Sequence, residues 1–149
     1  MIDDLDRIMA VMEAAFDPAF GEAWTRRQVE DALILGNCHY LLIGPDGEMP
    51  PGDMAVGFSL SRHGFGEEEL LLFAIDPAHR RKGLGQRLLE YFAASAKSRK
   101  AERLLLEMRR GNPAEHLYRA FGFSPIGERP KYYRTPDGNR IDAITFSYE

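Results

Sequence analysis

The amino-acid sequence predicts an α/β protein in which helices cover both faces of a mixed central sheet. Segments with apolar residues at helical spacing alternate with short apolar runs typical of strands. Residues 69–108 then read as strand, helix and strand in that order, which predicts a right-handed unit with two parallel strands. The length of 149 residues, 44% of them hydrophobic, predicts a single domain over residues 1–149 with a substantial core.

The first part of the chain predicts two helices. Apolar residues recur at helical spacing over residues 3–16, so we expect an amphipathic helix there. Thr25 followed by Gln28 fits a capping box, which predicts that a second helix opens at Thr25. Gly36 is the residue type that commonly ends a helix, and we expect the second helix to stop there.

The remaining segments complete the order ααβββαβαββ. The third expected strand is an almost continuous apolar run, which is typical of a strand covered on both faces. The helix after it begins near Gly83 and Gly85, and a shorter helix has Asn112 as its cap. The expected strands cover residues 39–43, 54–61, 69–75, 103–108, 124–134 and 141–148.

Composition narrows the classes of function. The net charge of -4 argues against a general nucleic-acid binder. No apolar run approaches the length that a membrane span needs. Cys38 is the only cysteine, which excludes an internal disulfide and a multi-thiolate zinc site, and the four histidines show no metal spacing. We therefore expect a cytoplasmic protein with no metal, no nucleic-acid partner and no membrane partner.

A basic turn precedes the third helix. Arg80, Arg81 and Lys82 stand at the amino end of this helix, where the macrodipole disfavours cations. A bound phosphate would reverse that penalty, and Gly83 and Gly85 would let a ligand approach the backbone. A solvated surface turn is the alternative, but the buried strand before it favours a phosphate site. The two common nucleotide-binding motifs, the Walker loop and the dinucleotide fingerprint, are both absent.

The turn matches the pattern Arg/Gln-x-x-Gly-x-Gly/Ala and follows "FAIDPAH". It resembles the acetyl-coenzyme A motif of the GNAT superfamily of N-acetyltransferases. The resemblance implies a V-shaped opening between the two central parallel strands, a turn that holds the pyrophosphate, and a preceding strand that pairs with the pantetheine arm. The cofactor-binding residues that it implies are Phe73, Ala74, Ile75, Arg80, Arg81, Lys82, Gly83, Leu84, Gly85, Asn112 and Tyr118.

Further motifs resemble the bacterial ribosomal-protein-alanine N-acetyltransferase subfamily. They are "LLLEMR", "N…LY…GF", "R..YY" and "DA", together with the pair Trp24-Thr25 near the start of the chain. The resemblance implies that the acceptor is a protein N-terminal amine, the alanine of a small-subunit ribosomal protein. We expect the enzyme to be a monomer or homodimer. The resemblance also implies a substrate groove lined by Trp24, Arg129, Tyr132 and Tyr133.

Two residues carry the chemistry that this resemblance implies. Glu107 ends a parallel strand, at the edge of the sheet where α/β proteins bind ligands. The family uses this position as the general base and Tyr118 as the general acid near the coenzyme sulfur. From the residues alone, Glu107 could instead pair with an arginine, and Tyr118 could be a core residue of its helix. Asn112 is a helix cap first and a pantetheine contact second.

Other functions remain open at this point. One alternative is acetylation of a small-molecule amine or of a lysine side chain. Another is a non-catalytic acyl-coenzyme A-binding protein that kept the basic turn. The presence of both Glu107 and Tyr118 favours an enzyme.

Overall fold

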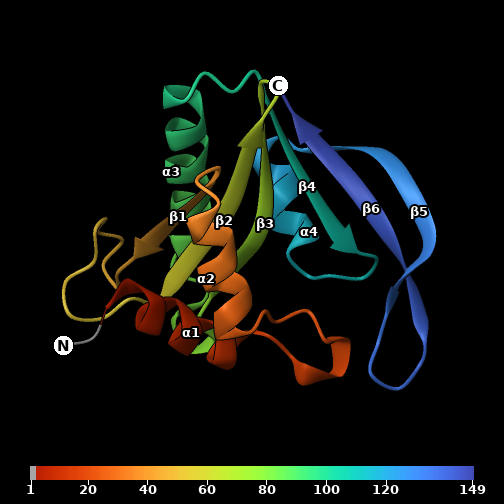
Figure 1. Cartoon of the computed structure of the whole chain (residues 1–149), viewed down its shortest axis with the longest axis horizontal. Coiled ribbons are helices and arrows are strands. Elements are labelled where there is room, and N and C mark those ends of the chain that lie inside the picture. Colours follow the sequence, from red (N-terminus) through yellow and green to blue (C-terminus); the bar gives the residue numbers. More distant parts are fainter. Residues whose placement is uncertain (1–2) are drawn as a thin grey trace.

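A six-stranded sheet forms the centre of the computed structural model, which describes residues 3–149 (Figure 1). The strand order is β1-β2-β3-β4-β6-β5. Only β3 and β4 run parallel, and every other neighbouring pair is antiparallel. This confirms the predicted mixed sheet. The strands are β1 (Cys38–Ile43), β2 (Gly57–Gly64), β3 (Glu67–Ile75), β4 (Arg103–Arg109), β5 (Ser124–Arg134) and β6 (Arg140–Tyr148).

Helices cover both faces of the sheet, as predicted (Figure 1). On one face, α1 (Asp4–Ala15) and α2 (Arg26–Ile34) build a core with side chains of β1, β2 and β3. On the other face, α3 (Leu84–Ser98) and α4 (Glu115–Phe121) pack on a second core. Two short 3₁₀ helices, Pro18–Phe20 and Pro77–His79, lie in the connections after α1 and β3.

Local sequence explains where most helices begin. The capping box before α2 is present: the Gln28 N–H donates to Thr25 Oγ1 at 3.2 Å, and the Thr25 N–H donates to Gln28 Oε1 at 2.8 Å. The expected cap of α4 is wrong by one short turn. Asn112 Oδ1 accepts the Ala114 N–H at 2.9 Å, so Asn112 caps the turn that precedes α4, and the helix itself begins at Glu115.

The two parallel strands separate partway along their length. Residues 67–70 of β3 pair with residues 103–106 of β4, and the pairing stops there. The register between β2 and β3 shifts at the same point, because Leu60 pairs with Leu72 and Ser61 with Leu70. Leu71 is therefore an extra residue, a β-bulge that bends the strand and changes the face to which its side chains point. The expected V-shaped opening is confirmed.

Candidate active site

A cavity of about 350 Å³ lies where β3 and β4 diverge. Its walls come from the α1–α2 connection, β3, β4, α4 and β5. Because the strands separate, side chains from both faces of the sheet reach one space. The predicted site residues that line it are Trp24, Phe73, Glu107, Asn112, Tyr118 and Tyr133.

Tyr118 enters the cavity from α4. Only 6% of the residue is exposed, and Phe73 and Phe123 hold its ring edge-on, with centroids 6.0 and 6.1 Å away. Its hydroxyl makes no hydrogen bond within residues 3–149. Burial raises the pKa of this hydroxyl far above its usual value, so Tyr118 keeps its proton at neutral pH. The residue can therefore donate that proton to a group arriving in the cavity.

Glu107 enters the cavity from β4, where its neighbours Leu106 and Met108 point to the opposite face and pack against α3 and α4. The Thr145 hydroxyl donates to Glu107 Oε2 at 3.2 Å, and Arg129 Nε lies 3.4 Å from the same oxygen. The Glu107 side chain is 19% exposed. Its other oxygen, Oε1, accepts no hydrogen bond from the part of the chain that the structure describes, so it is free to take a proton.

The other residues predicted to line the substrate groove lie in β5. Tyr133 lines the cavity, and burial together with the charges of Glu107 and Glu22 raises its pKa to about 12. Tyr132 is half-exposed and packs edge-on against Tyr133, with ring centroids 5.4 Å apart. The Arg129 guanidinium lies 5.1 Å from the Tyr132 ring centroid. Arg129 and Tyr132 are thus beside the cavity rather than in its wall.

The basic turn presents free backbone donors to solvent. Gly83 has φ +76° and precedes α3, which has no side-chain cap. The first backbone bond of the helix runs from Arg87 N to Gly83 O, so the N–H groups of Leu84, Gly85 and Gln86 have no acceptor among residues 3–149. Nothing lies within 4 Å of a Cβ added at Gly83. These open N–H groups fit phosphate oxygens.

Gly85 has a different role from the one its sequence position suggests. A Cβ added there would lie 2.9 Å from Leu117 Cδ2 of α4. The missing side chain therefore lets α3 and α4 approach each other, rather than only giving a ligand access to the backbone. The Arg80 side chain already makes one hydrogen bond within the protein, since its Nε donates to the Ile75 carbonyl oxygen at 3.3 Å.

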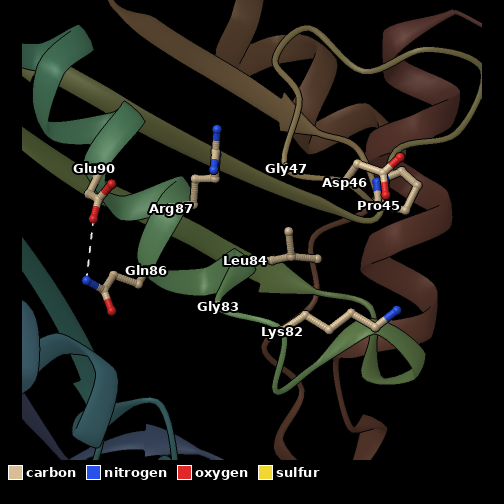
Figure 2. Close-up of a pocket in the computed structure, with 9 residues that line it drawn as sticks. All are labelled: Pro45, Asp46, Gly47, Lys82, Gly83, Leu84, Gln86, Arg87 and Glu90. Atoms are coloured by element: carbon tan, nitrogen blue, oxygen red, sulfur yellow. Dashed lines mark hydrogen bonds between the residues drawn. The ribbon is translucent and has the colours of Figure 1, made fainter.

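A second hollow of about 340 Å³ adjoins the basic turn (Figure 2). It lies between residues 45–47 of the β1–β2 connection and the start of α3. Figure 2 shows Lys82 extending below Asp46 and Gln86 beside Glu90, to which Gln86 donates at 3.4 Å. Two cations, Lys82 and Arg87, and two carboxylates line this hollow, so its charge is mixed. The row of backbone N–H groups is therefore the feature of this region that best fits an anion.

One cluster beside the cavity, in which Arg109 contacts two of the residues that line it, could not be predicted from the sequence. Arg109 Nε lies 2.9 Å from Glu22 Oε1, and the Arg109 guanidinium carbon lies 3.6 Å from the Phe20 ring centroid. These contacts hold the α1–α2 connection against β4. Glu22 and Arg109 stand 87 positions apart, so no local pattern points to the pair.

Residues 3–149 show neither a cluster of metal-binding side chains nor a helix that could span a membrane. No group of three or more histidine, cysteine, aspartate or glutamate side chains is arranged to hold a metal ion within this range. Within the same residues, no helix has both the length and the apolar character needed to cross a membrane.

The free edge of β3 fits an extended ligand. Beyond Leu70 this strand has no partner on the β4 side among residues 3–149, so backbone groups of residues 71–75 can pair with a ligand lying in the opening. The basic turn follows directly after this edge. An acyl-coenzyme A molecule, with an amide-bearing arm and a pyrophosphate, has the groups that match both features.

Known proteins share this arrangement. The chain is 39% identical over 94 residues to the ribosomal protein bS18-alanine N-acetyltransferase of Escherichia coli, which covers 62% of either protein. It is 29% identical over 134 residues to a Bacillus subtilis protein provisionally assigned the same activity, covering 89% of this chain and 82% of that protein.

Solved structures of other proteins have the same fold as this chain. The crystal structure of the Escherichia coli ribosomal-protein-S18-alanine N-acetyltransferase superposes with a TM-score of 0.78 at 27% identity, over 98% of this chain and 88% of that one. A Bacillus subtilis acetyltransferase in complex with coenzyme A shares the fold, with a TM-score of 0.72 at 16% identity over 100% and 95% of the two chains. The acetyltransferase (GNAT) domain family matches residues 37–125, more than half of the sequence. The chain therefore belongs to the GNAT family of N-acetyltransferases.

Proposed function

We propose that this enzyme transfers the acetyl group of acetyl-coenzyme A to the α-amine of a protein N-terminus, and that its acceptor is the alanine of ribosomal protein bS18. The observation that carries the proposal is the cavity at the strand divergence, which both Glu107 and Tyr118 line. Among residues 3–149, one carboxylate oxygen of Glu107 and the hydroxyl of Tyr118 have no hydrogen-bond partner. The activity of the Escherichia coli relative supports the choice of acceptor. We place the protein in the cytoplasm and assign this activity to one domain over residues 1–149.

Acetyl-coenzyme A supplies an acetyl thioester, and the chain binds it through backbone groups. The N–H groups of residues 84–86 hold the pyrophosphate, with Arg80, Arg81 and Lys82 as nearby cations. The free β3 edge at Phe73, Ala74 and Ile75 pairs with the pantetheine arm, and Asn112 lies in the cavity wall near its end.

Two proton transfers accompany acetyl transfer. The neutral amine nitrogen forms a bond to the thioester carbonyl carbon, and the carbon–sulfur bond breaks. Glu107 takes the proton that the amine loses, either directly or through a water molecule. Tyr118 gives its proton to the departing sulfur; its raised pKa ensures that the hydroxyl is protonated at neutral pH when the sulfur departs. Aromatic walls exclude bulk water from the reacting atoms.

The acceptor enters between the α1–α2 connection and β5. Trp24 and Tyr133 line the cavity on these two sides, with Arg129 and Tyr132 next to them. A groove between two such segments suits an extended peptide end. A free small amine would use fewer of these contacts, and so would a lysine side chain.

A coenzyme A-release assay with matched peptides tests the proposal. One peptide carries the bS18 sequence with a free N-terminal alanine, and its twin carries a blocked α-amine and a free lysine. We expect rapid thiol release with the first peptide only. Preference for lysine or for polyamines would reject the acceptor but keep the enzyme. Tight acetyl-coenzyme A binding without release to any amine would leave a non-catalytic binding protein.

A further inference from the structure

The strand β5 contains a wide bulge directly before Tyr133. Arg129 pairs with Ala143 of β6 and Tyr133 pairs with Ile141, so residues 130–132 all stand opposite the single residue Asp142. Within this bulge Lys131 has φ +54°, a left-handed conformation that side-chain-bearing residues rarely adopt. In Figure 1 the β5–β6 pair continues past the end of β4, on the side of the connection between α1 and α2.

Asp142 contacts the bulge and the end of β4 at the same time. Its Oδ1 accepts the Lys131 N–H at 2.8 Å, and Arg110 Nε lies 3.4 Å from its Oδ2. The Asp142 carbonyl oxygen accepts the Arg110 N–H at 2.8 Å, and the Arg110 side chain also pairs with Glu128 of β5. The hydrogen bond from Lys131, together with Arg110, lowers the pKa of Asp142, so its carboxylate stays ionised at neutral pH.

The carboxylate replaces a missing partner in the strand ladder. The bulge leaves Lys131 without a residue of its own to pair with in β6, and its N–H bonds to the Asp142 carboxylate instead. Without the carboxylate, Lys131 would keep a disfavoured conformation with nothing to stabilise it. Regular pairing continued from Arg129 and Ala143 would place Tyr133 opposite Asn139 instead of Ile141, a shift of two positions. At about 3.3 Å per residue, Tyr133 would then lie about 6–7 Å further along β6 and would leave the cavity.

We propose that Asp142 is a positioning residue for the acceptor site: its carboxylate holds the β5 bulge in the shape that keeps Tyr133 in the wall of the cavity, beside Glu107. This inference rests on the proposed use of the cavity for an N-terminal peptide. It concerns binding of the acceptor and leaves acetyl-coenzyme A binding unaffected.

A double-mutant cycle tests the coupling between Asp142 and Tyr133. Asp142→Ala should lower kcat/KM for the N-terminal peptide by about tenfold, the scale for losing a hydrogen bond to a charged group, with acetyl-coenzyme A affinity unchanged. Asp142→Asn keeps an oxygen for the Lys131 N–H and should recover most of the activity. In a Tyr133→Ala background, Asp142→Ala should add little further loss. Full activity of Asp142→Ala, or losses that multiply in the double variant, would overturn the proposal.

The control removes an unrelated carboxylate. Asp53 is exposed in the β1–β2 connection, and its side chain makes no hydrogen bond or ion pair within residues 3–149. Asp53→Ala should leave all of these kinetic values unchanged. An effect equal to that of Asp142→Ala would show that the loss of any surface acid is enough, and would reject a specific role for Asp142.

Amide hydrogen exchange tests the same contact without any assay of activity. Asp142→Ala should raise the exchange rate of the Lys131 amide by about tenfold or more while amides of the β4–β6 pair keep their protection. This result would support the role of Asp142 even if the acceptor proved to be a different amine. Unchanged protection of Lys131 would reject the role whatever the acceptor is.

Discussion

The opposite roles proposed for Tyr118 and Glu107 follow from their different surroundings. Tyr118 is buried among aromatic rings, so ionisation is unfavourable and the hydroxyl keeps its proton. Glu107 has one oxygen held by Thr145 and Arg129 and another that is free to accept a proton. The two residues approach from opposite faces of the sheet, and they meet only because β3 and β4 separate.

Removing the Tyr118 hydroxyl tests its role as the acid. Tyr118→Phe keeps the ring in its aromatic cluster, so we expect a folded protein with normal acetyl-coenzyme A affinity by calorimetry. Turnover should fall by about 100-fold, the usual scale for losing a general acid. Tyr148→Phe is a matched control, since Tyr148 belongs to the same aromatic cluster outside the cavity wall. Full activity of folded Tyr118→Phe would make the tyrosine a core residue only.

The pH dependence of the rate tests Glu107. Glu107→Gln should cut turnover by about 100-fold and remove the acidic limb of the kcat/KM profile, because that limb records proton loss from the base. Glu102→Gln, which removes an exposed carboxylate just before β4, should leave the profile as it is. An acidic limb that persists in Glu107→Gln would assign the base to another group.

At the scale of elements, the basic turn contains two glycines with different surroundings. Gly83 combines φ +76° with open space, whereas Gly85 faces Leu117 of α4. Gly83→Val should weaken acetyl-coenzyme A binding by about tenfold or more. The valine adds backbone strain of about 1–2 kcal/mol and places a side chain next to the backbone N–H groups of residues 84–86. Gly85→Val should lower the melting temperature instead. Calorimetry and thermal unfolding of the two variants distinguish these effects, and equal cofactor affinity in Gly83→Val and wild type would remove the pyrophosphate from this turn.

Elements that depend on neighbouring residues were predictable from the sequence. The capping box of Thr25 and the glycines at the start of α3 act within a few positions of the chain, so their helices were placed correctly. The bulge at Leu71 was not predictable, because it exists only in the pairing between β2 and β3. The contact of Arg109 with Glu22 joins distant segments for the same reason. The start of α4 was placed one short turn too early. An asparagine that caps a turn and one that caps a helix have the same local sequence pattern.

Across the whole molecule, a buried charged cluster ties the sheet to α3 at the end away from the cavity. Glu68 of β3 is fully buried and accepts hydrogen bonds from Ser61 and from Arg99, whose Nη2 lies 2.6 Å from it. His63 Nδ1 lies 3.1 Å from the same carboxylate. Burial alone would raise the pKa of Glu68, but the bonds from Arg99 and Ser61 outweigh it and lower the pKa below 4.5.

This cluster predicts how stability depends on pH. Because the pKa of Glu68 is lower in the folded chain, its contribution is present above pH 4.5 and is lost as the pH falls through the folded value. Glu68→Gln leaves the Arg99 charge without its partner and should lower the free energy of unfolding at pH 7 by about 3 kcal/mol. Urea titrations should also show a weaker loss of stability in acid for this variant than for the wild type. An unchanged free energy at pH 7 would mean that the cluster adds no stability.

Acetyl transfer in the cavity between the diverging strands has one most direct test. It is a crystal structure with a conjugate that links the coenzyme A sulfur through an acetyl bridge to the α-nitrogen of an alanine peptide. We expect the sulfur within hydrogen-bonding distance of the Tyr118 hydroxyl, the pyrophosphate on the N–H groups of residues 84–86, and the peptide between Trp24 and Tyr133. A conjugate that binds with its sulfur outside this cavity, or with its phosphates away from the basic turn, would contradict the account.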